Sequence, residues 1–161
     1  MHSTNGGFVM AVVIVGLVVL QQLRPRPIRR IGSLIAPVIF AVLGVAGLAF
    51  GVLSVVKDRP LTALPIALLV VSFVVATGFG AARSRTVRVW RDPEGVVLRK
   101  GTAATTALWL ASVCAHIALG LWIDHAAGTG LLGTASLYAY VAFGLGTQNL
   151  LLRGRAAATD R

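Results

Sequence analysis

Five long apolar blocks constrain the fold of this chain more than any other feature. Their interiors contain no Asp, Glu, Lys or Arg, and each is close to the length of about 20 residues that a helix needs to cross a bilayer. The chain has 57% hydrophobic and only 12% charged residues, about half the charged fraction of an ordinary soluble domain. The sequence therefore predicts an all-α integral membrane protein, a bundle of five transmembrane helices forming one domain over residues 1–161. The predicted spans cover about residues 6–23, 31–56, 61–82, 102–123 and 130–152.

Basic residues are distributed unevenly among the connections between these blocks. Of the 15 lysines and arginines, all but Lys57 and Arg59 lie in one set of alternating connections. Cytoplasmic loops are enriched in Lys and Arg, so we expect the N-terminus outside and the C-terminus in the cytoplasm. The first block is expected to be retained as a span, because no basic residue precedes it and a basic segment follows it. With the net charge of +10 placed in loops, anionic lipid is a better expected partner than nucleic acid.

The connection at residues 83–101 is basic and rich in β-branched residues. Asp92, Pro93 and Gly95 have the spacing of a type I turn followed by a left-handed residue. We therefore expect a short cytoplasmic β-hairpin between the third and fourth spans. The predicted strands are 86–91 and 96–100.

The register of this hairpin has a chemical consequence. Trp90 is expected to face Leu98, and Arg88 to face Lys100. Facing cations are unfavourable unless an anion lies between them, and a lipid phosphate would serve. We therefore predict that Arg88, Trp90, Arg99 and Lys100 bind lipid headgroups. The alternative is a solvated basic loop that only enforces the topology.

Polar side chains within the spans are concentrated in the last two, where helix depth predicts two layers. The outer layer comprises His116, Tyr138, Tyr140 and Cys114. The inner layer comprises Gln148, Asn149, Thr105 and Trp109. We interpret these residues as interhelical hydrogen-bonding groups that hold the bundle together; the alternative is a ligand or haem pocket centred on His116. The single cysteine excludes a CxxC pair and a multi-cysteine metal site, and neither a metal site nor a catalytic residue is predicted.

Three glycines in the second block, Gly44, Gly47 and Gly51, share the spacing of closely packed helices. Gly47 and Gly51 form a small-xxx-small motif of the kind found at helix–helix contacts in membranes. We expect these glycines to pack a helix of the same chain. Homodimerisation through the same face is the alternative.

Several short motifs resemble the CcdC-like family of small bacterial integral membrane proteins. They are "RPRPIRR" leading into "LIAPVIF", the small-residue run "GVAGLAFG", and "RTVRVWRDPEGVVLRKGT" followed by "ALWLAS". The resemblance implies a bacterial inner-membrane protein connected with cytochrome c biogenesis. It implies no activity and no catalytic residue for this chain.

The predicted function is structural or accessory, with a basic cytoplasmic face that binds anionic lipid or a protein partner. One alternative is a small membrane enzyme or haem-binding protein centred on His116. The other is a transporter or channel component, which the lack of ionisable groups inside the spans disfavours. No cofactor is predicted, and the sequence leaves homo-oligomerisation open.

Overall fold

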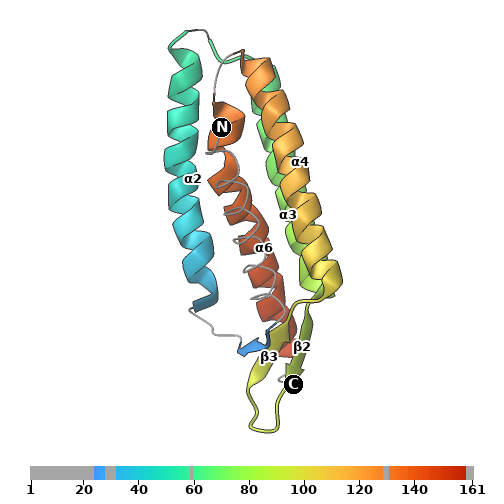
Figure 1. The fold of residues 1–161 in the computed structure, drawn as a ribbon. Coiled ribbons are helices and arrows are strands. Elements are labelled where there is room, and N and C mark those ends of the chain that lie inside the picture. Colours follow the sequence, from blue (N-terminus) through green and yellow to red (C-terminus); the bar gives the residue numbers. More distant parts are fainter. Residues whose placement is uncertain (1–23, 28–31, 59, 129–130, 159–161) are drawn as a thin grey trace, which may run out of the picture.

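The structure of the chain, a computed structural model, describes residues 24–27, 32–58, 60–128 and 131–158. It is a mostly helical bundle with a small sheet at one end (Figure 1). The helices are α2 (Gly32–Val56), α3 (Ala63–Thr86), α4 (Ala103–Ala127), α5 (Leu132–Ala135) and α6 (Leu137–Ala158). The strands are β1 (Arg26–Pro27), β2 (Arg88–Arg91) and β3 (Val97–Lys100). The predicted span at 6–23 lies outside the described residues.

Three of the described helices are long and apolar enough to cross a membrane. They cover Leu34–Val56, Ala63–Thr86 and Ala103–Ala127. Their outer surfaces remain apolar, with Val45 70% exposed and Leu53 69% exposed. Soluble proteins rarely show extended apolar surfaces of this kind, so the surface indicates a membrane protein.

The last predicted span is divided in the structure. The short helix α5 ends at Ala135 and α6 begins at Leu137, so the uninterrupted helix expected over 130–152 is corrected. Asp124, near the end of α4, accepts hydrogen bonds from the backbone N–H groups of Gly133 (2.6 Å) and Thr134 (3.2 Å). Because these bonds satisfy free N–H groups at the start of α5, they hold it as a separate turn against α4.

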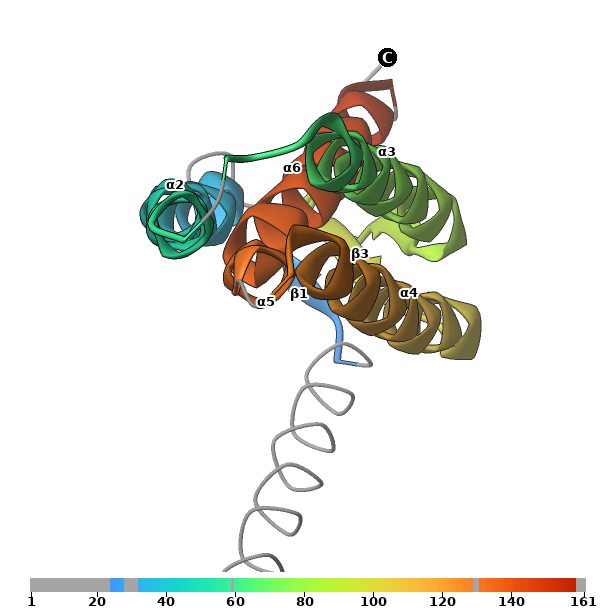
Figure 2. The ribbon, with the colours of Figure 1, turned by 90° about the horizontal axis from the view of Figure 1, so that it is seen from above.

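Helix α6, the last in the chain, lies between α2 and α3 (Figure 2). It packs against both, and α4 packs against α3 and α5. The three predicted packing glycines of α2 face α5 and α6. A Cβ built on Gly44 would lie 2.7 Å from Cα of Ala139, and one built on Gly47 would lie 2.5 Å from the carbonyl oxygen of Ala135. The small-residue face of α2 is thus used within the chain.

The hairpin register follows the prediction. Arg88 pairs with Lys100 and Trp90 with Leu98. Gly95 has φ of +84°, the left-handed conformation that favours glycine. Both strands are slightly shorter than expected. Strand β2 begins later because α3 continues to Thr86.

A third strand corrects the expectation of a two-stranded hairpin. Arg26 pairs with Arg99 and Pro27 with Leu98, so the sheet order is β1-β3-β2 and β3 is central. A hairpin alone is marginally stable. The added strand β1 covers the edge of β3.

Candidate functional site

The buried charge of the bundle is Arg83, which the sequence places in a loop. In the structure α3 extends through it to Thr86, and Arg83 is only 4% exposed. Its Nε donates a hydrogen bond to the carbonyl oxygen of Phe79 at 3.3 Å. Helical Cα–Cβ bonds tilt toward the N-terminus, so the side chain runs back into the bundle and away from the sheet. The predicted span 61–82 contains no ionisable group, but Arg83, expected in the following loop, lies in the last turn of α3.

Arg83 lines a small, partly open cavity between α3, α4 and α6. Its volume is about 30 Å³, above the roughly 10–15 Å³ that one water molecule requires and far below the roughly 300–1,000 Å³ of pockets for organic ligands. The cavity is therefore much smaller than a haem. The polar lining residues are Arg83, Ser112, His116 and Tyr140. The others are Trp109, Val113, Leu137, Val141 and Leu145.

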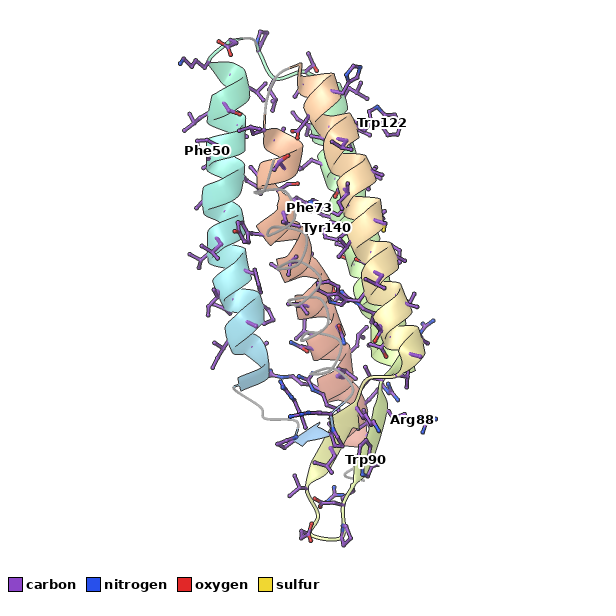
Figure 3. The ribbon with its side chains drawn as sticks, viewed as in Figure 1. Phe50, Phe73, Arg88, Trp90, Trp122 and Tyr140 are labelled. Atoms are coloured by element: carbon purple, nitrogen blue, oxygen red, sulfur yellow. The ribbon has the colours of Figure 1, made fainter. Side chains whose placement is uncertain are left out.

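Tyr140 and Ser112 form a closed hydrogen-bonded pair on one wall of this cavity. The Tyr140 hydroxyl, which lies among the helices (Figure 3), donates to the Ser112 carbonyl oxygen at 2.9 Å. It also lies 3.0 Å from Ser112 Oγ. Since a hydroxyl has one hydrogen, Ser112 Oγ must donate to Tyr140 in this arrangement. Both hydroxyl protons are thereby used within the pair.

His116 lies against this pair and has an unused ring nitrogen. Its ring centroid is 4.5 Å from that of Tyr140, and the residue is 5% exposed. Nδ1 is buried and has no hydrogen-bond partner among the described residues. A buried polar atom without a partner is costly, so hydrogen bonding between helices does not account for Nδ1.

Arg83 forms no ion pair with the described carboxylates, which lie elsewhere in the fold. Asp58 follows α2 at the far end of the bundle, and Asp124 binds the start of α5. Asp92 and Glu94 belong to the hairpin turn. The positive charge therefore has no acidic partner in the part of the chain that the structure describes.

The predicted outer layer separates into two groups. His116 and Tyr140 come together at the cavity, whereas Cys114 is exposed. Tyr138 is 45% exposed and stacks on Phe40 with ring centroids 6.2 Å apart. Residues two positions apart on a helix are separated by about 200° around its axis. Tyr138 and Tyr140 therefore face different sides of α6.

The predicted inner layer also forms no single cluster. The hydroxyl oxygens of Thr105 and Thr86, at the end of α3, are 2.9 Å apart. Thr105 also belongs to the capping box that begins α4. Asn149 is buried on α6 and accepts a hydrogen bond from Arg99 at 3.2 Å. Trp109 lines the cavity, and Gln148 is half-buried on α6.

The predicted headgroup-binding residues lie on both faces of the sheet. Side chains alternate along a strand, so Arg88, Trp90 and Lys100 share one face. Arg99 lies on the other, opposite Arg26, and contacts α6. Burial, and secondarily the charge of Arg26, lowers the pKa of Arg99.

Comparison with known proteins yields no relative. No family model, no curated protein and no solved structure matches this chain. The resemblance to the CcdC-like family therefore stays a prediction, and the function has to be inferred from the residues themselves.

Proposed function

We propose that this chain is an accessory protein of a bacterial inner membrane, and that its basic sheet binds anionic lipid headgroups at the cytoplasmic surface. One observation carries the proposal. Arg88 and Lys100 are direct cross-strand partners, both exposed, on the face that also holds Trp90. Like charges in this arrangement repel, and a phosphate between them removes the repulsion.

Trp90 favours a lipid surface over a soluble anion. Tryptophan combines an apolar ring with one hydrogen-bond donor and is enriched at membrane interfaces. The sheet lies at one end of the bundle, and Arg88 and Trp90 lie at the opposite end from Trp122 (Figure 3). This places an interfacial residue beside cations that each contribute about 1 kcal/mol near an anionic surface.

The distribution of charge supports an orientation with the sheet in the cytoplasm. Among the described residues, Lys57 is the basic residue at the far end of the bundle. The sheet end carries Arg24, Arg26, Arg85, Arg88, Arg91, Arg99, Lys100, Arg153 and Arg155. This asymmetry satisfies the positive-inside rule and leads to the proposed C-terminus in the cytoplasm.

Lipid binding is tested with two matched lysine variants. The purified protein in a neutral detergent is expected to melt at a higher temperature with phosphatidylglycerol than with phosphatidylcholine, because a ligand of the folded state stabilises it. Lys100→Gln should reduce this difference, and added salt should mimic the change. Lys57→Gln removes an equally exposed lysine from the other end and should leave the difference intact. Equal melting temperatures in the two lipids would contradict the proposal, and capture of a soluble acidic protein without any lipid effect would favour a protein partner.

The orientation is tested separately. Alkaline phosphatase, which is active only outside the cytoplasm, and green fluorescent protein are fused in turn to the C-terminus. We expect an inactive phosphatase and a fluorescent reporter. The reverse pattern would overturn the orientation.

A further inference from the structure

We infer that the cavity between α3, α4 and α6 binds a small inorganic anion of halide size, held by Arg83 and His116. This site is independent of the proposed lipid-binding sheet. The side chain of Arg83 points away from the sheet, and the residues that line the cavity come from the three helices. The inference depends on the charge, the donor set and the size of the cavity.

The charge of the cavity is positive and has no described counter-ion. A buried guanidinium without an opposite charge is unfavourable, since removing a charge from water is repaid only by an opposite charge or by full hydrogen bonding. The Nε of Arg83 donates a hydrogen bond to the carbonyl oxygen of Phe79. The remaining guanidinium N–H groups, which cannot lose their protons, belong to a side chain that lines the cavity.

The donors at the cavity outnumber the acceptors. The protons of Tyr140 and Ser112 are directed within their own pair, so these hydroxyls do not compete for a ligand. A neutral imidazole can carry its proton on Nδ1 and donate from there, and Nδ1 of His116 is the buried atom without a partner. With the proton of His116 on Nδ1, Arg83 and His116 both present N–H groups to an acceptor, and an anion is the acceptor that also balances the charge.

The size of the cavity selects the class of anion. A volume of about 30 Å³ admits one or a few water-sized particles, which suits a monatomic anion better than a lipid phosphate with its substituents. Gly144, on α6, leaves room for the guanidinium of Arg83. A Cβ built at that position would lie 2.7 Å from Nη2 of Arg83, so even alanine would displace the end of the guanidinium.

Thermal melts in matched salts test the inference. The purified protein in neutral, lipid-free detergent is heated in sodium chloride, sodium bromide or sodium gluconate at constant ionic strength. Gluconate is too large for the cavity and serves as the reference anion. Halide at ten times its dissociation constant should lower the unfolding equilibrium constant about tenfold, giving a saturable rise in melting temperature that gluconate does not produce. Identical melting curves in chloride and gluconate would overturn the inference.

A matched arginine pair assigns the effect to the cavity. Arg83→Gln should abolish the difference between halide and gluconate. Arg85→Gln makes the same change at an exposed position two residues away on α3 and should preserve it. A halide effect that persists in Arg83→Gln would place the anion elsewhere and refute the site.

A second measurement remains decisive if Arg83→Gln does not fold. The variant Trp90→Phe/Trp122→Phe retains Trp109, which lines the cavity, as its one tryptophan. Bromide quenches indole fluorescence on contact, so occupancy of the cavity should give quenching that saturates with bromide and is reduced by competing chloride. Quenching that rises linearly with bromide and is indifferent to chloride would show collision from outside and would overturn the inference.

Discussion

Gly80→Ala is expected to destabilise the folded protein by about 2 kcal/mol, in the range typical of overpacked interiors. Gly80 lies where α3 crosses α6, and a Cβ built on it would contact the carbonyl oxygen of Gly144 below normal van der Waals distance. It would also lie 3.1 Å from Cβ of Thr147. Because the nearest obstacle is backbone, the two helices have to separate to admit the methyl group.

Gly78 provides the control for this experiment, since it lies two residues earlier on the same helix. A Cβ at Gly78 would meet nothing within 4 Å, so Gly78→Ala should be neutral or stabilising by up to about 1 kcal/mol through helix propensity. Reversible unfolding in detergent, followed for the parent and both variants, measures the difference. Equal stabilities of the two variants would show that α3 and α6 are not in close contact at Gly80.

Tyr140→Phe is expected to lower the free energy of unfolding by about 1.5 kcal/mol. The hydroxyl of Tyr140 is bonded to both the carbonyl oxygen and Oγ of Ser112, and its removal leaves buried polar atoms to find other partners. Hydrogen bonds within bilayers are individually weak, and this limits how far the free energy of unfolding can fall. The phenylalanine ring preserves the packing against His116, so the change isolates the hydroxyl.

Tyr138→Phe makes the same change on the exposed side of α6, where the hydroxyl of Tyr138 has no hydrogen bond to the described residues, and should change the free energy of unfolding little. A double-mutant cycle that combines Tyr140→Phe with Ser112→Ala tests the pairing directly. We expect a coupling energy of about 1 kcal/mol between these two changes. Additive effects would mean that the two side chains do not interact in the folded protein.

The parts of the fold that the sequence predicted are those with local signals. The helix at 31–56 is read from an uninterrupted apolar block, and the observed α2 covers Gly32–Val56. The hairpin register follows from turn chemistry, because Asp92 and Gly95 fix which residues face each other. In both cases the determining residues lie within a few positions of the feature that they specify.

The parts that the sequence missed depend on contacts between distant residues. Arg83 resembles a loop residue because it follows an apolar block, and only the packing of α4 and α6 gives it a buried position. Strand β1 is two residues long and is defined by its partner Arg99. The break between α5 and α6 depends on Asp124, which lies on another helix. The spacing of Tyr138 and Tyr140 was a usable signal, since residues two apart cannot share a helix face.

The position of α6 between α2 and α3 also has a consequence for biosynthesis. The ribosome completes α2 before it has made the helix that covers the glycine face of α2, and about three fifths of the chain separates Gly44 from Ala139. In the proposed membrane setting, α2 therefore enters the bilayer without its permanent neighbour and has to persist there alone. Its composition suits this interval, because its mean hydropathy of 2.5 is the highest of the three apolar helices. The bundle closes only when its last helix is inserted between two that are already in place.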